Sequence, residues 1–185
     1  MTQQTRSRIL AGLLSVAVLL PATACRGKRA TTVQNDEGTP QPVNLPPASS
    51  LKMSDAGAPG QIVRGVYPLE ANAWRWTAGN FSILLKTPPG AAQKGATVSL
   101  TLVVSDAVLK QVKSQTLTAS VGDKSVGSEK YTTAGDFAFA ADIPATALTG
   151  DTVTVDFSLD NSLPPGPADR RELGIIVSAI SIDSK

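Results

Sequence analysis

Thr97-Val98-Ser99-Leu100-Thr101-Leu102-Val103-Val104-Ser105 is the stretch that decides the fold, because apolar and hydroxyl side chains alternate along it. Successive side chains of a β-strand point to opposite faces of the sheet, so a period of two predicts a strand with one buried and one solvent-facing side. Thr152–Asp160 repeats the pattern with Val153, Val155, Phe157 and Leu159 on one face. Strands that are wet on one side are typical of antiparallel sheets.

Short runs of alternating apolar and polar residues, separated by Gly, Pro, Asp and Asn, fill the C-terminal two thirds of the chain. The further candidate strands are 62–67, 73–77, 81–86, 116–121, 136–142 and 172–182. This pattern predicts an all-β domain over residues 61–185. An open single sheet would leave two edges and an apolar face exposed, so the expected architecture is one antiparallel two-sheet β-sandwich of jelly-roll or immunoglobulin-like type.

The N-terminus has the three parts of an export signal. Arg6 and Arg8 precede the apolar run Ile9–Leu20, and Pro21–Ala24 supplies a turn and small residues for cleavage. Twelve apolar residues are too few to cross a hydrocarbon core that needs about 20. Residues 1–24 are therefore predicted to be a signal peptide.

Ala22-Thr23-Ala24-Cys25 resembles the lipobox of bacterial lipoproteins. The resemblance implies that Cys25 is acylated, becomes the first mature residue and tethers the chain to a membrane of the cell envelope. Ala22-Thr23-Ala24 also satisfies the A-x-A rule of ordinary signal peptidase, in which case the protein is secreted. The residue after Cys25 is Arg26, where an aspartate would resemble the inner-membrane retention signal of many Gram-negative bacteria. The absence of that aspartate favours the outer membrane.

Residues 25–60 are predicted to be the lipidated cysteine and a disordered linker. The segment is polar and contains five prolines, with little apolar periodicity. Such a composition does not bury enough apolar surface to offset the entropy of ordering the chain.

Composition excludes several classes of function. The formal charge of +2 becomes zero once the signal leaves, because residues 1–24 hold two arginines and no acidic residue, so no basic footprint for nucleic acid remains. The chain has no histidine and a single cysteine, which removes the common zinc and copper ligands and the histidine-dependent catalytic triads. We expect no cofactor, no metal and no catalytic residue, and therefore not an enzyme.

Trp74-Arg75-Trp76 is the most suggestive local motif. A period of two places both indoles on one face of a strand and the guanidinium on the other. We expect two parallel aromatic faces that suit a sugar or a flat partner, with core packing of at least one indole as the alternative.

Arg170 and Arg171 follow a proline-rich loop and precede the C-terminal strand. Their forked donors bind carboxylates, either on a ligand such as an acidic sugar or inside the protein. The candidate internal partners are Asp169, Glu172 and Glu70.

Three segments together resemble the β-sandwich accessory domains that accompany bacterial glycosyltransferases and other envelope-polysaccharide proteins. They are Gly65-Val66-Tyr67 with Glu70, then 74–77, and finally 171–175. The resemblance implies a noncatalytic module near glycan chemistry. The candidate ligand-binding residues are Tyr67, Trp74, Trp76, Arg170 and Arg171, and the alternative function is a structural lipoprotein that docks onto an envelope protein.

Overall fold

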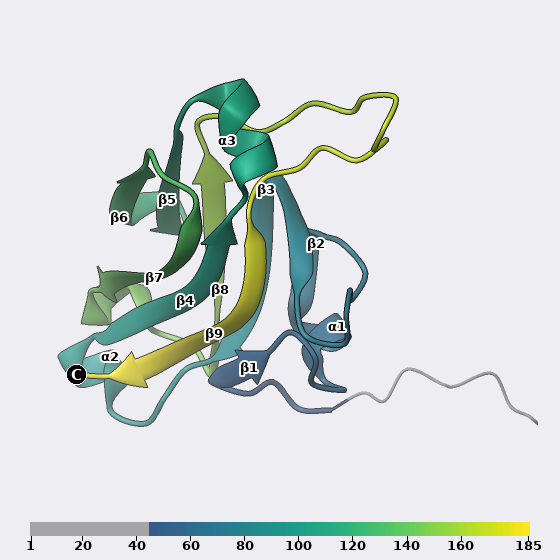
Figure 1. Ribbon diagram of the computed structural model, residues 1–185. Coiled ribbons are helices and arrows are strands. Elements are labelled where there is room, and N and C mark those ends of the chain that lie inside the picture. Colours follow the sequence, from purple (N-terminus) through teal and green to yellow (C-terminus); the bar gives the residue numbers. More distant parts are fainter. Residues whose placement is uncertain (1–44) are drawn as a thin grey trace, which may run out of the picture. The chain divides into compact units, whose positions relative to one another are not determined.

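The computed structural model describes residues 45–185, which form two packed layers of antiparallel strands (Figure 1). The strands are β1 (Ser50–Lys52), β2 (Ile62–Val66), β3 (Arg75–Lys86), β4 (Ala96–Val104), β5 (Gln115–Val121), β6 (Lys124–Tyr131), β7 (Gly135–Ile143), β8 (Thr152–Leu159) and β9 (Ile176–Ser184). Short helical segments connect them: α1 (Ala58–Gln61), α2 (Ala91–Lys94), α3 (Asp106–Val112) and the 3-10 turn η1 (Ala145–Ala147). The predicted all-β antiparallel sandwich is confirmed.

The long strand β3 belongs to both layers. Its first residues, Arg75 and Trp76, pair with β9 in a layer that continues through β4 to β7 and also holds β1. Its second half, Asn80 to Lys86, pairs with β8 in a layer ordered β6-β5-β8-β3-β2. The start of β3 therefore has β9 as a neighbour on one side and the chain that follows β2 on the other.

The core lies between the two layers and uses the faces that the alternation predicts. The apolar residues of β4 at 98, 100, 102 and 104 are buried, as are Val153, Val155 and Phe157 of β8. Phe81 and Phe157 stack with their ring centroids 4.8 Å apart, and Phe139 meets Phe157 edge to face. Aliphatic side chains and phenylalanines thus fill the interior.

The predicted domain boundary at residues 60 and 61 is wrong. Leu51 of β1 pairs with Ile180 of β9 and is 2% exposed, and Met53 and Ala58 are fully buried. Gln61 is also buried and bonds to the main chain of Ala48 and Leu84. A few apolar side chains within a proline-rich segment are enough to dock it, although they show no periodicity. Residues 1–44, with the signal, Cys25 and most of the predicted linker, lie outside the described residues.

Two smaller departures concern strands. The candidates 73–77 and 81–86 form one strand, β3, because Gly79 is a buried strand residue whose Cβ would lie 2.5 Å from Glu172 Oε1. β1 and β6 were not among the predicted strands, because β1 has only three residues, with Leu51 alone buried, and β6 is polar and largely exposed. No helix within residues 45–185 is long and apolar enough to cross a membrane.

Candidate functional site

The hairpin formed by residues 67–76 brings the aromatic candidates together. The Tyr67 amide donates to the Trp76 carbonyl at 2.9 Å, and Glu70 and Trp74 form a two-way bridge. Ala71 and Asn72 close the turn in the left-handed conformation, with φ of 50° and 52°. Residues directly opposite in an antiparallel pair share a face, so Tyr67 and Trp76 lie on the same side. We call Tyr67, Glu70, Trp74 and Trp76 the hairpin patch.

Both indoles of the hairpin patch are half-buried. Their ring centroids are 6.4 Å apart and the ring planes are 85° to one another. The expected pair of parallel faces is therefore wrong, because the rings meet edge to face, the arrangement that the quadrupoles of aromatic rings favour. The two rings therefore do not form one flat aromatic platform.

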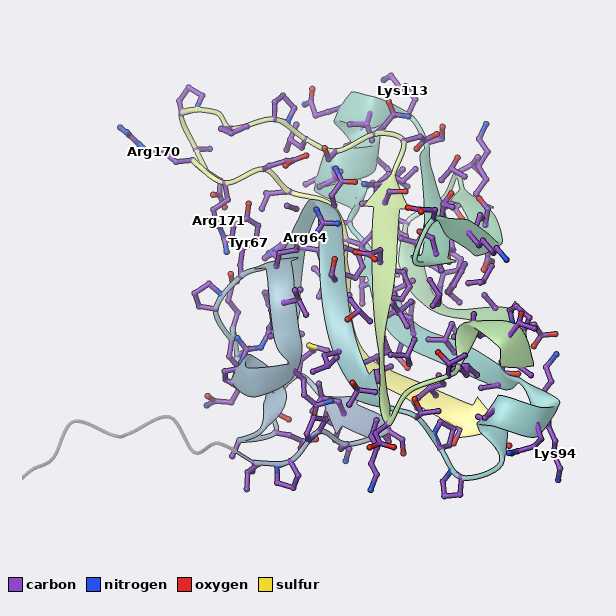
Figure 2. All side chains as sticks on the ribbon, turned by 180° about the vertical axis from the view of Figure 1, so that it is seen from behind. Arg64, Tyr67, Lys94, Lys113, Arg170 and Arg171 are labelled. Carbon is purple, nitrogen blue, oxygen red and sulfur yellow. The ribbon has the colours of Figure 1, made fainter. Side chains whose placement is uncertain are left out.

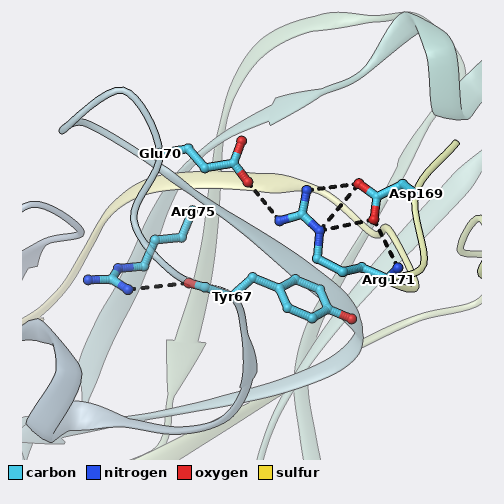
Figure 3. A network of polar contacts seen from close by, with 5 residues as sticks. All are labelled: Tyr67, Glu70, Arg75, Asp169 and Arg171. Atoms are coloured by element: carbon cyan, nitrogen blue, oxygen red, sulfur yellow. Dashed lines mark hydrogen bonds and ion pairs between the residues drawn. The ribbon is translucent and has the colours of Figure 1, made fainter.

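Arg75 points to the opposite side of the strand from its tryptophan neighbours, as predicted, and is 8% exposed. Its Nε donates to the Met53 carbonyl at 3.0 Å. Its Nη1 donates to the Tyr67 carbonyl at 3.2 Å (Figure 3). Desolvation lowers the pKa of its guanidinium. Arg75 thus joins the segment after β1 to the hairpin, and its charge is directed away from the indoles.

The second component of the site is the loop between β8 and β9, residues 160–175, which we call the arm. Figure 1 shows it projecting from the sandwich beside α3. Leu163 and Leu173 exchange two backbone hydrogen bonds of 2.8 and 2.9 Å, and the Gly166 amide donates to the Asp169 carbonyl at 2.7 Å. These bonds and three prolines restrict the arm, so that it can hold side chains in place.

Arg171 connects the arm to the hairpin patch through two carboxylates. Its Nη2 lies 2.8 Å from Asp169 Oδ2, and its Nη1 lies 2.7 Å from Glu70 Oε1 (Figure 3). The guanidinium also sits 5.2 Å from the centre of the Tyr67 ring, within the range of a cation–π contact. Hydrogen bonds from the Arg171 side chain and amide hold the pKa of Asp169 below its usual value, and those carboxylates raise the pKa of Arg171.

The structure therefore separates the two candidate arginines. Arg171 has the internal partners Asp169 and Glu70, two of the three that the sequence suggested, whereas Glu172 accepts a hydrogen bond from the Ser162 hydroxyl. Arg170 is exposed, has no ion pair within residues 45–185 and points outward from the tip of the arm (Figure 2). It borders a shallow hollow of about 450 Å³ with Pro165, Gly166 and Pro167.

Two polar features outside the patch were not predicted. On the second layer Asp156 accepts from Ser82 and forms an ion pair with Arg64 at 3.0 Å. A larger hollow of about 560 Å³ lies between residues 86–93 and 148–151, and its lining contains no aromatic side chain. In the described part of the chain no three side chains gather as metal ligands. Only the register between strands brings Arg64 to Asp156, so no sequence signal could have identified that pair.

Comparisons with known proteins give weak likenesses to solved structures. No protein-family model matches the chain, and no curated protein matches it. The similar solved structures include three carbohydrate-binding modules. The module CsCBM6-3 from Clostridium stercorarium, solved with cellobiose, is 12% identical over 75% of this chain and 95% of its own, with a TM-score of 0.39. A CBM4 module is 10% identical over 74% and 85%, with a TM-score of 0.36, and the xylan-binding module CBM15 is 15% identical over 64% and 95%, with a TM-score of 0.35. At such scores, function has to be argued from the geometry of this chain.

Proposed function

We propose that this chain is a noncatalytic β-sandwich module of the bacterial cell envelope that binds a glycan through the hairpin patch. In this proposal lipid on Cys25 tethers it to a membrane, the outer membrane where there are two. The patch supplies aromatic surface, and the arm keeps it in place.

One observation carries the binding proposal: both tryptophans of the chain stay half-buried on one hairpin. Three of the four phenylalanines are fully buried in the core, at 81, 139 and 157. Burying large apolar side chains stabilises a fold by about 1.5–3 kcal/mol each. Two indoles that forgo part of that gain at adjacent sites indicate a surface selected for contact.

The chemistry of the patch suits sugars. An indole offers a rigid apolar face to the C–H face of a sugar ring and a polar N–H at its rim. The side chains of Glu70 and Asp169, which are 35% and 34% exposed, offer hydrogen-bond acceptors beside it. Because Arg171 and Arg75 hold the hairpin from two directions, little ordering entropy would be lost on binding.

The binding proposal is tested by calorimetric titration of residues 26–185 with a panel of oligosaccharides. Trp76→Ala and Trp74→Ala are expected to weaken binding by tenfold or more, since truncating a central aromatic contact usually costs over about 1.4 kcal/mol. The matched control is Val63→Ala, which changes an exposed apolar residue on the neighbouring strand β2. Unchanged affinity in both tryptophan variants would refute the hairpin patch as the site.

A second candidate is docking onto an envelope protein, and one observation favours it. Val63 is 56% exposed on β2, which pairs with β3 through two irregular register shifts. An exposed apolar residue on an edge strand is a surface to which another chain can add. This alternative predicts the reverse pattern in a pull-down from envelope extracts: Val63→Ala loses a partner, and the tryptophan variants retain it.

The anchor is tested on the full chain by mass spectrometry of detergent-extracted protein. We expect acyl groups on Cys25 and membrane association that Cys25→Ser abolishes, because two or more acyl chains inserted in a membrane anchor a protein stably. Unmodified Cys25, or a chain that starts at another residue and appears in the medium, would replace the lipoprotein by a secreted protein.

A further inference from the structure

We infer that the hairpin patch recognises a neutral, hydroxyl-rich glycan and discriminates against glycans that carry carboxylates. The inference rests on the proposed function and specifies its ligand class. Of the two alternatives for Arg170 and Arg171, an acidic sugar or internal carboxylates, it rejects the acidic sugar, and it follows from the contacts that the arginines around the patch make.

All three guanidinium nitrogens of Arg171 already bind internal carboxylates. A guanidinium recognises a carboxylate through two parallel N–H donors on one edge. Its Nε and Nη2 edge is held by Asp169, with contacts of 2.8 to 3.3 Å, and its Nη1 binds Glu70 at 2.7 Å. An acidic sugar would have to compete with these two internal carboxylates, so we assign Arg171 as a positioning residue for the arm and the Tyr67 ring.

Two further arginines, Arg75 and Arg170, direct their guanidinium groups elsewhere. The Arg75 guanidinium is buried on the far side of β3 and donates to two backbone carbonyls. The side chain of Arg170 extends outward from the arm, away from Arg171 and Tyr67 (Figure 2). The aromatic surface is therefore bordered by the carboxylates of Glu70 and Asp169, with no free guanidinium directed onto it from these three arginines.

Carboxylates that border an aromatic surface select their ligand by hydrogen-bond polarity. Ionised Glu70 and Asp169 are acceptors without donors, so they bind the hydroxyl groups of a neutral sugar and repel a uronate. Two like charges a few ångströms apart near a protein surface repel enough to lower affinity on the order of tenfold. The effect should shrink at high salt, because these side chains are half-exposed.

The test uses residues 26–185 and two sets of probes of matched length: neutral hexasaccharides of glucose and xylose, and hexasaccharides of galacturonate and mannuronate. For the unaltered protein we expect at least tenfold tighter binding of the best neutral probe than of any acidic one. Glu70→Ala removes the carboxylate and frees Arg171 Nη1, so it should narrow this ratio by about tenfold. Glu70→Gln removes the charge but keeps a carbonyl oxygen that can still accept from Arg171 Nη1, so it should narrow the ratio less. The matched control is Asp142→Ala, which removes a carboxylate that is also ion-paired, to Lys185 at 2.8 Å, and should leave the ratio unchanged.

The outcomes separate the inference from the proposed function. Tight binding of an acidic probe, or a ratio that Glu70→Ala leaves unchanged, overturns the inference, while loss of all binding in Trp76→Ala still supports the hairpin patch. Binding of an acidic probe that Arg170→Ala abolishes would assign recognition to the tip of the arm and also overturns it. Failure of every probe to bind refutes the proposed function and the inference with it.

Discussion

Met53 provides the sharpest test of where the domain begins. Its side chain is fully buried in a segment whose sequence indicates a linker, between β1 and α1. Truncating a buried methionine to alanine removes transfer free energy and leaves a cavity, which together cost about 2–5 kcal/mol. For a domain of this size, a loss of about 3 kcal/mol corresponds to a fall in Tm of roughly 10 °C.

The assay is urea denaturation and calorimetry of residues 45–185 with Met53→Ala, beside the neighbouring exposed residue changed in Lys52→Ala. The lysine variant should stay within about 0.5 kcal/mol of the parent. A fragment that starts at Gln61 should lose more unfolding free energy than the Met53→Ala variant. It lacks both the strand β1 that pairs with β9 and Ala48, whose main chain binds the Gln61 side chain. Equal stability of the two substituted proteins would refute the packing of this segment.

Three further predictions concern single side chains. Arg171→Ala should leave the sandwich folded but speed amide exchange at Leu163 and Leu173 in the arm, as hydrogen–deuterium exchange will show; unchanged exchange would mean that the arm needs no clamp. The pKa of Asp169 is lowered in the folded state, so its contribution to stability is present above about pH 4 and is lost as the pH falls through the pKa of the folded state. Asp169→Asn should therefore reduce the loss of stability at acid pH. An acid-induced loss equal to that of the parent protein would contradict this. Burial, with a smaller contribution from the Glu129 carboxylate, raises the pKa of Tyr131, so stability should decline as pH rises above about 10. Within residues 45–185 the buried Tyr131 hydroxyl has no hydrogen-bond partner, so Tyr131→Phe should be neutral or stabilising and should remove the alkaline decline; a loss above about 1 kcal/mol would contradict this.

The strands that could be predicted from the sequence are those with one buried face and one solvent-exposed face. Alternation along β4 and β8 predicts both strands and their buried sides, because burial on one face requires a period of two. β1 has three residues and β6 is largely exposed, so their pairing depends on neighbours that no local pattern specifies. Gly79 shows the opposite failure, since a glycine that usually marks a break lies here inside a strand, where the side chains of Glu172 and Ser162 approach it closely.

The candidate site could be predicted in its members but not in its geometry. A period of two places Trp74 and Trp76 on one side and Arg75 on the other, whereas the perpendicular rings depend on side-chain torsions. The pairing of Arg171 with Glu70 spans 101 positions and follows from the adjacency of the arm and the hairpin. Sequence proximity did suggest Asp169, which is two residues away and also accepts the Arg171 amide.

The chemistry of the hairpin follows from the use of two arginines as clamps. Arg75 ties the hairpin to the segment after β1, and Arg171 ties it to the arm, so two other pieces of the chain fix the same turn. A cation that is saturated by internal acceptors contributes position in place of charge, and the groups left to meet a ligand are the indoles and the exposed oxygens of the carboxylates. If the clamps were ligand-binding groups, an acidic glycan would compete with Asp169 and Glu70 and would loosen the arm as it bound. A neutral glycan would leave both ion pairs intact, so amide exchange in the arm during saturation with each class of probe distinguishes the two modes directly.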